Sequence, residues 1–299
     1  MHDAAIIEVG LNESLMRAQH SSVPYSPAEC AADANLCADA GAAVVHWHAR
    51  EPATGAPRLG DAELYGEALA AMRHADVLAY PTYPVDVHTV DERLGHCWSL
   101  RATHGLELTP VDVGSVTIVL WDEPTRRLSP AVEFLRAFGV VENPLPFTLD
   151  ALARIGELGM VASIGAFDVG ATRTAVLLAE SGVLRPPIFL KIFLSEAWAV
   201  GPFPTEDAID FHLAQLPPGL DVEWVVVPYT IGDPALVERL CRHALARGGG
   251  VRVGIGDNPS AFPDATNAAL VERAVAWAGD AGRPVASAAD VRKRFGLPA

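Results

Sequence analysis

The sequence predicts an α/β protein and, within that class, a (β/α)8 (TIM) barrel. Eight strand-like segments alternate with eight helical connections over roughly 250 residues, the usual length of such a barrel. Residues 111–120 and 225–227 are largely apolar, as strands are when helices cover both faces of a parallel sheet. No Gly-x-Gly-x-x-Gly follows the first strand, so the second choice, a doubly wound open sheet, lacks its main dinucleotide-binding signature.

The individual elements follow from apolar runs, capping residues and turn residues. Ser26, Pro27 and Glu29 mark the first helix as N-cap, first helical residue and capping-box acid. The expected strands are residues 6–10, 41–50, 76–82, 111–120, 160–167, 187–194, 223–229 and 250–255. The expected helices are residues 26–41, 61–74, 91–105, 129–138 with 149–159, 172–182, 205–216, 234–248 and 267–282. Because no linker or composition shift divides them, we expect one barrel domain over residues 1–299.

The composition argues against several classes of function. The formal net charge is -15 and no run of Lys or Arg is present, which argues against nucleic-acid and acidic-membrane partners. The first residues lack the basic and apolar regions of a signal peptide, and no uncharged apolar run approaches bilayer-spanning length. We therefore expect a cytoplasmic protein whose partners are small molecules.

Two histidines stand at the end of the second expected strand. Side chains alternate across a strand, so His46 and His48 point the same way while Trp47 points the other way. Such a pair can hold a divalent metal, with zinc the first choice, if a third donor comes from elsewhere. Alternatively, one histidine is a hydrogen-bonded core residue and the other faces solvent. Their position at the carboxyl end of a barrel strand, where such barrels hold catalytic metals, favours the metal site.

Several motifs occur in a characteristic order along nearly the whole chain. They are residues 27–29, 41–50 (Gly-Ala-Ala-Val-Val-His-Trp-His-Ala-Arg), 91–94, 114–115, 167–170, 251–258, 266–268 and 282–286. In these motifs the chain resembles the beta-keto acid cleavage enzymes, whose founding activity cleaves 3-keto-5-aminohexanoate with acetyl-CoA. Because the motifs extend over the chain in the right order, this resemblance is more specific than any single motif.

The resemblance implies a reaction and roles for particular residues. A zinc-held beta-keto acid would exchange its acyl part with acetyl-CoA as co-substrate, giving acetoacetate and a new acyl-CoA. The resemblance assigns proton transfer to Arg252 and Asp257 on the eighth strand, and substrate contacts to Glu13 and Thr82. Ser115 is a further candidate for substrate binding, although Thr82 and Ser115 could equally be strand-end residues bonded to the backbone. The resemblance also implies a homo-oligomer.

The chain departs from the family pattern at two acidic positions. The family's third metal ligand, a glutamate just before the strand-8 aspartate, is here Gly256, and an acid expected at the end of the fifth strand is here Gly165. Three alternatives follow for a metal bound by the two histidines: water and substrate supply the remaining ligands, the metal binds weakly, or another acid of the chain turns toward the metal. The candidates for that acid are Asp257, Glu13 and Asp112. Loss of both acids predicts a substrate without the positive amino group of the founding one.

Lys191 interrupts an apolar strand, which is costly unless the amine is paired or functional. Its amine could meet an acid at the barrel mouth, bind the substrate carboxylate, or act as a Schiff-base nucleophile. The sequence therefore leaves two further alternatives to the acetyl-CoA reaction. One is a lyase or aldolase that works without coenzyme A, and the other is a non-catalytic ligand-binding barrel.

Overall fold

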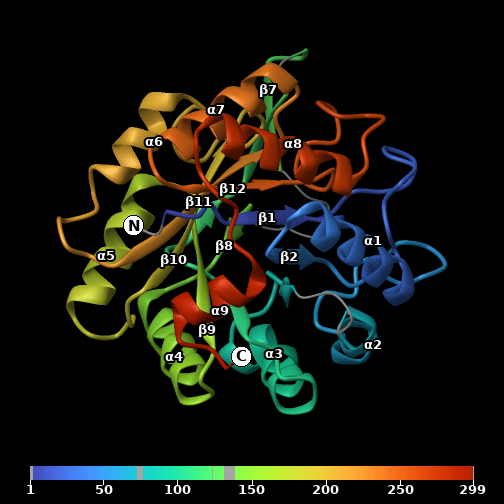
Figure 1. Ribbon diagram of the computed structural model, residues 1–299. Helices are drawn as coiled ribbons and strands as arrows, with labels where there is room; N and C mark the ends of the chain where they lie inside the picture. Colours follow the sequence, from blue (N-terminus) through green and yellow to red (C-terminus); the bar gives the residue numbers. More distant parts are fainter. Residues whose placement is uncertain (1–2, 73–76, 123, 131–138, 299) are drawn as a thin grey trace.

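A computed structural model describes residues 3–72, 77–122, 124–130 and 139–298. Its main sheet has eight parallel strands in the order β3-β2-β1-β12-β11-β10-β9-β4. The sheet curls into a nearly closed barrel with the helices on its outside (Figure 1). The predicted (β/α)8 barrel is therefore confirmed.

The elements alternate as the sequence predicts. The barrel strands are β1 (Ile7–Gly10), β2 (Val44–Trp47), β3 (Leu78–Pro81), β4 (Leu108–Asp112), β9 (Val161–Ala166), β10 (Ile188–Ser195), β11 (Val222–Tyr229) and β12 (Gly250–Val253). The helices are α1 (Pro27–Ala40), α2 (Ala62–Met72), α3 (Val90–His104), α4 (Leu145–Glu157), α5 (Val169–Glu180), α6 (Glu206–Leu213), α7 (Pro234–Ala246), α8 (Asn267–Asp280) and α9 (Ala288–Phe295). At α1, Ser26 and Glu29 form the predicted capping box.

β3 and β4 stand at the two ends of the strand order and are not joined by a hydrogen-bond ladder, and two prolines contribute to this gap. Leu78 and Thr82 donate their backbone N–H groups toward β2, so the alternation of the strand directs the N–H position of Pro81 toward β4. Val113 likewise donates toward β9, which directs the position of Pro110 toward β3. Proline has no N–H to donate. Each of the two strands thus lacks one donor on the side where a backbone ladder would close the barrel.

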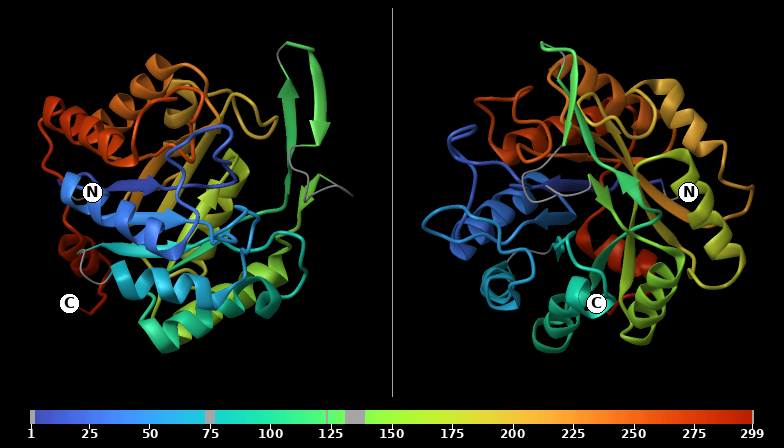
Figure 2. Two further views of the ribbon diagram at one scale, coloured as in Figure 1. Left: turned by 90° about the vertical axis from the view of Figure 1, so that its right-hand side faces the viewer. Right: turned by 180° about the vertical axis from the view of Figure 1, so that it is seen from behind.

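The prediction for residues 111–120 is wrong in its bounds. The barrel strand ends at Asp112, and the following residues form two short antiparallel pairs, β5 (Val116–Thr117) with β8 (Val140–Val141) and β6 (Val119–Asp122) with β7 (Arg127–Pro130). The β6–β7 hairpin extends away from the barrel (Figure 2). Apolar residues in this stretch serve a hairpin as well as they would serve a buried strand, so hydropathy alone does not separate the two.

Two expectations for helices also differ from the structure. Of the expected helix 129–138, residues 129–130 belong to β7 and residues 131–138 lie outside the described residues. α9 was not expected; Val291 packs with interior residues such as Phe189 and Leu108, so α9 covers the amino-terminal end of the barrel. The opposite end is left for the polar side chains described below. No helix in the described part of the chain is long and apolar enough to cross a membrane.

Candidate active site

The two predicted metal-binding histidines lie at the carboxyl end of the barrel. His46 is inside β2 and His48 follows it directly, and both side chains face the same space. The ring of His46 packs on the ring of Tyr80 from β3, with 4.6 Å between centroids. Nδ1 of His46 lies 3.2 Å from the backbone carbonyl oxygen of Tyr80. A carbonyl can only accept, so Nδ1 carries the proton and Nε2 keeps its lone pair.

Glu13 from the loop after β1 completes a cluster with these histidines. Its carboxylate oxygens lie 3.4 Å from Nε2 of His46 and 3.1 Å from Nε2 of His48. One donor atom from each of the three residues lies within 4.8 Å of the other two. Glu13 is thus the acid, among the three candidates, that turns toward the histidines.

The donor set fits a divalent metal. Burial lowers the pKa of His46 well below its usual value, so its imidazole is neutral and Nε2 accepts. A lone pair then faces a carboxylate oxygen of Glu13, and two acceptors at that distance repel unless a cation lies between them. Two imidazole nitrogens and one carboxylate are the ligand set of several catalytic zinc sites.

Glu13 is held in place by its own loop. Its backbone has φ of 38°, a left-handed conformation that a non-glycine residue keeps only under constraint. Arg50 supplies the constraint: its guanidinium donates to the backbone oxygens of Asn12 and Glu13. The side chain of Asn12 donates to the carbonyl of His48 at 3.0 Å and accepts from the N–H of His48 at 2.8 Å. The loop and the second histidine are therefore fixed to one another.

The glycine at position 256 is explained by this loop. A Cβ atom at Gly256 would lie 2.9 Å from the backbone nitrogens of both Asn12 and Glu13, closer than real Cβ atoms come. The backbone that carries Glu13 therefore occupies the space that a side chain at position 256 needs. An acid at this position and Glu13 in its present place exclude each other.

We expect Gly256→Ala to destabilise the protein by about 1–3 kcal/mol, because the new methyl group must displace the backbone of the Glu13 loop. The same displacement should weaken metal binding, which titration with zinc would measure beside urea unfolding. Gly95→Ala, in α3, is the matched control, since a Cβ there meets nothing within 4 Å. This control should be neutral or stabilising by up to about 1 kcal/mol. Equal unfolding free energies for the two variants would contradict the prediction.

Arg252 lies at the centre of a buried cluster of carboxylates. Its side chain is 1% exposed and contacts three acids. It donates to Oδ1 and Oδ2 of Asp257 at 2.7 and 3.1 Å, to Oε1 of Glu8 at 3.3 Å, and to Oε1 of Glu13. The register of the sheet explains the pairing with Glu8, which is the partner of Arg252 across β1 and β12. The predicted pair of Arg252 and Asp257 is present, and it belongs to a larger network.

The pKa values in this cluster move in different directions. Burial raises the pKa of Asp257 to about 7, although the Arg252 guanidinium acts in the opposite direction. Burial also acts against the charge of Glu13, but Arg252 and the two histidines prevail and hold the pKa of Glu13 well below its usual value. Near neutral pH, Glu13 is therefore an ionised carboxylate, the form that can bind a metal, while Asp257 can exchange a proton.

Lys191 is buried, and it forms no ion pair with an acid in the part of the chain that the structure describes. Its Nζ lies 2.6 Å from the hydroxyl oxygen of Tyr80, whose hydrogen is donated to Oε1 of Glu8 at 2.6 Å. Burial, and then Glu8, raises the pKa of Tyr80 well above its usual value, so this hydroxyl stays a donor. Burial lowers the pKa of Lys191. The chain from Lys191 through Tyr80 to Glu8 connects the lysine to the Arg252 cluster.

A cavity of about 120 Å³ opens at this end of the barrel. Glu13, His46, His48, Thr82, Lys191 and Arg252 all line it. Asp257 is fully buried behind Arg252 and is not part of the wall. Ser115 is also absent from the wall; its hydroxyl accepts a hydrogen bond from the backbone N–H of Asn143 at 2.9 Å. The structure thus brings together all the predicted site residues except Ser115. Asp257 does not reach the cavity itself but is hydrogen-bonded to Arg252, which does.

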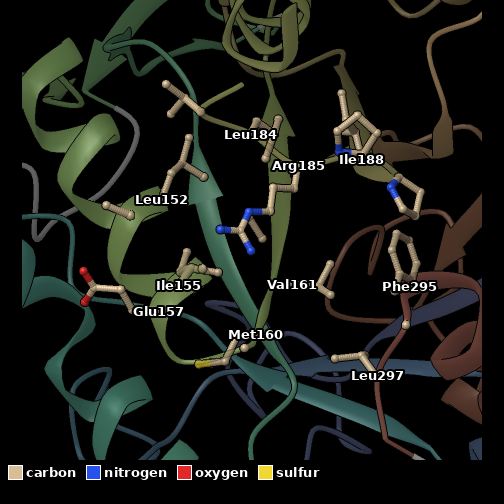
Figure 3. Close-up of a pocket in the computed structure, with 18 of the residues that line it drawn as sticks. Leu152, Ile155, Glu157, Met160, Val161, Leu184, Arg185, Ile188, Phe295 and Leu297 are labelled. Carbon is tan, nitrogen blue, oxygen red and sulfur yellow. The ribbon is translucent and has the colours of Figure 1, made fainter. Parts of the chain in front are cut away.

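A larger cavity, of about 570 Å³, lies at the amino-terminal ends of β9 and β10. Its wall is mostly apolar, and Glu157 and Arg185 are the charged side chains that Figure 3 labels there. Size alone would favour this cavity over the one at the carboxyl end of the barrel. Chemistry selects the smaller one, because catalytic groups of these barrels gather at the carboxyl ends of the strands.

Sequence reasoning missed three residues of this site. In the sequence, Glu8 stands only within the expected strand 6–10, Tyr80 within the expected strand 76–82, and Arg50 at the end of the motif 41–50. The sequence does carry a signal for Glu8, since an acid in a buried strand needs a cationic partner, and Arg252 in another buried strand needs an acidic one. Arg50 and Tyr80 act through contacts between distant segments, which hydropathy does not reveal.

Comparison with known proteins gives three findings. The family model described as beta-keto acid cleavage enzyme matches residues 4–297. A 3-dehydrocarnitine:acetyl-CoA trimethylamine transferase of Rhizobium meliloti (strain 1021) is 29% identical over 315 aligned positions, covering 96% of this chain and 94% of that protein. A solved ternary complex of ObcA with a C4-CoA adduct and oxalate has a TM-score of 0.67 at 16% identity, covering 92% of this chain and 68% of that one.

The barrel gathers histidine, acid, lysine and arginine side chains in a cavity at the carboxyl ends of its strands, the place where barrels of this kind carry out catalysis. The likeness to ObcA supports the fold. The chain belongs to the beta-keto acid cleavage enzyme family, as the match over nearly its whole length shows. It is therefore an acyltransferase that cleaves a carbon–carbon bond, and the alternative of a non-catalytic barrel is not supported.

Proposed function

We propose that this enzyme exchanges the acyl part of a beta-keto acid with acetyl-CoA in a metal-dependent reaction. The products are acetoacetate and a new acyl-CoA. The bond from the acyl carbon to the α-carbon breaks and the α-carbon bonds to the acetyl carbonyl carbon, while the sulfur of coenzyme A leaves the acetyl group and bonds to the released acyl carbon. The observation that carries the proposal is the cluster of Glu13, His46 and His48 on the cavity wall of a chain of this family. The Rhizobium relative, named as an acetyl-CoA-dependent enzyme, supports acetyl-CoA as co-substrate.

Glu13, His46 and His48 would hold the metal, and zinc is the expected ion for two imidazoles and a carboxylate. When bound, the metal would polarise the keto and carboxylate oxygens of the substrate. Glu13 takes the place of the acid that Gly256 lacks. The role of Glu13 thereby changes from the substrate contact implied by the resemblance to a metal ligand.

Arg252 and Asp257 would manage charge and proton. Arg252 lines the cavity, so its guanidinium is placed to stabilise the negative charge that develops when the α-carbon loses a proton. Asp257 orients this guanidinium through two hydrogen bonds and, with a pKa of about 7, is the candidate to accept and return the proton. Lys191 and Thr82 line the same cavity, and we assign to Lys191 the binding of the substrate carboxylate.

One observation favours a second candidate, a Schiff-base aldolase. Lys191 is 3% exposed, lines the cavity, and has a lowered pKa because of its burial. A buried amine of this kind is more nucleophilic at neutral pH than an exposed lysine. The hydrogen bond to Tyr80 argues for the carboxylate-binding role, since it holds the amine in one position.

The test is an assay of zinc-loaded enzyme with a panel of beta-keto acids, with and without acetyl-CoA. We expect acetoacetate and the new acyl-CoA to form in equal amounts, and only when acetyl-CoA is present. Consumption of the keto acid without acetyl-CoA would reject the acyl exchange in favour of a lyase. A borohydride-reduced adduct on Lys191 would instead establish the aldolase. Light scattering of the same sample would test the homo-oligomer, which we retain as part of the proposal.

A further inference from the structure

The larger cavity, at the amino-terminal ends of β9 and β10, takes no part in the reaction described so far. Its volume of about 570 Å³ lies within the range of roughly 300–1,000 Å³ that small-molecule pockets occupy. It is bordered by the end of α4, the first residues of β9 and β10, and the segment that follows α9. Ile188 of β10 lines this cavity, whereas Lys191 of the same strand lines the polar one. A ligand here would therefore occupy a site of its own.

Apolar side chains form two facing walls of the larger cavity. Leu152 and Ile155 of α4 stand on one side, and Ile188 of β10 and Phe295 of α9 stand on the other (Figure 3). Leu152, Ile155 and Ile188 are buried, although they border the hollow. An apolar chain placed between the walls would contact these side chains in place of water, which the hydrophobic effect favours.

Arg185 stands between the two walls. Figure 3 shows its side chain directed into the hollow. In the part of the chain that the structure describes, its guanidinium makes no hydrogen bond and no ion pair. Glu157, the acid on the wall, lies 3.9 Å from Arg154, and its carboxylate is turned away from Arg185 (Figure 3). Arg185 is therefore a cation in a largely apolar hollow, without an anion of its own among the described residues.

The backbone holds Arg185 at this place. Leu184, the residue before it, is buried, and Pro186 and Pro187 follow it directly. The proline rings fix the φ angles of their own residues, so the segment has little freedom to move. A ligand that binds the guanidinium then has to order only a side chain, and this lowers the entropy cost of binding.

The charges on the wall select the kind of anion. Of the described residues that line the cavity, Arg185 is the cation and Glu157 is the acid. One guanidinium matches one carboxylate, to which it can donate two parallel hydrogen bonds. A doubly charged phosphate would find no second cation, and both Glu157 and the last carbonyl groups of α4 and α5 would repel it. The hollow thus fits an anion with a single charge and an apolar tail.

We propose that this cavity binds a medium-chain fatty carboxylate, with the chain between the apolar walls and the carboxylate on Arg185. The site is separate from the cluster of Glu13, His46 and His48, so the inference goes beyond the proposed reaction and does not depend on it. The ligand needs neither a keto group nor coenzyme A.

Titration calorimetry of the full chain with octanoate tests the two parts of this site. Hexanoate should bind about ten-fold more weakly than octanoate, because two fewer methylene groups are buried. In Arg185→Met, the affinity for octanoate should fall about two- to five-fold, the scale of one partly exposed ion pair. 1-Octanol, which has the same chain without the charge, should bind equally to both proteins. Arg173→Met, at an exposed position of α5 outside the cavity, is the matched control and should bind octanoate like the wild type.

A second variant fills the cavity. Gly156 lines the hollow, and a Cβ atom there meets nothing within 4 Å, so Gly156→Trp places a ring in the hollow without displacing the backbone. We expect it to weaken octanoate binding at least ten-fold, because a ring in the hollow takes the place of several methylene groups of the ligand. Gly279→Trp is the matched control, since Gly279 is also the next-to-last residue of its helix, meets nothing within 4 Å, and lies outside the cavity.

Three results would overturn the inference. No binding of octanoate to the wild type would reject the site outright. Octanoate binding that Gly156→Trp leaves unchanged would place the ligand in the polar cavity or on the surface. A Gly156→Trp protein with half the wild-type mass in light scattering would show that a second copy of the chain covers the cavity. Because every readout is binding or mass, a failed acetyl-CoA exchange would leave these results unaffected.

Discussion

A double variant, His46→Ala with His48→Ala, should contain no zinc above background, whereas the wild type should hold close to one ion per chain. The reason is that the variant keeps only Glu13 of the three donors, and one carboxylate does not retain zinc. Elemental analysis of purified protein measures this directly. We expect acetoacetate formation to fall by roughly a hundred-fold or more in parallel, the scale on which the loss of an electrostatic group in an active site acts.

Two further variants make this result specific. Glu13→Gln keeps both histidines but replaces a charged ligand by a weak one, so its zinc affinity should lie between those of the wild type and the double variant. His88→Ala removes an exposed histidine and should leave the zinc content unchanged. Full zinc occupancy in the double variant would mean that the ion binds elsewhere and that this cluster is not the metal site.

Arg252→Met should destabilise the protein by about 3–5 kcal/mol, the largest stability effect that we expect from a single substitution in this chain. The variant removes the cation between Glu8, Glu13 and Asp257 and leaves three buried carboxylates facing one another. Urea unfolding monitored by circular dichroism measures the change. Protonation would relieve part of the repulsion, so the deficit should be smaller at pH 5 than at pH 8.

Two further variants serve as controls for Arg252→Met: Arg252→Lys as a conservative replacement, and Arg242→Met as the same substitution at an exposed arginine. A lysine keeps the charge but cannot reach three acids with a planar fork, so we expect Arg252→Lys to recover stability in part and activity very little. Arg242→Met breaks an exposed pair with Glu238 and should cost no more than about 1 kcal/mol. Similar losses for Arg252→Met and Arg242→Met would show that the buried cluster does not depend on its arginine.

The fold could be predicted because its signals are local. Each βα unit can be recognised in the sequence by an apolar run, a capping residue or a turn. Ser26 and Glu29, for example, mark the start of α1 as its N-cap and capping-box acid. The prediction failed after Asp112, where the apolar stretch continues through the end of the barrel strand into the β6–β7 hairpin. Hydropathy reports that side chains avoid water, but it does not report which neighbour they pack against.

By itself, the sequence determined the barrel, the family, the placement of His46 and His48 on one face, and the roles that the resemblance implies for Arg252 and Asp257. Only the tertiary structure decided which acids meet these groups. Glu13 meets the two histidines where Gly256 offers no side chain, and Asp112 reaches the space above Gly165, because the barrel brings the ends of distant strands within a few ångströms of one another. The sequence shows that a glycine has no side chain to offer. It does not show that a residue of a neighbouring strand or loop fills the space left at that glycine.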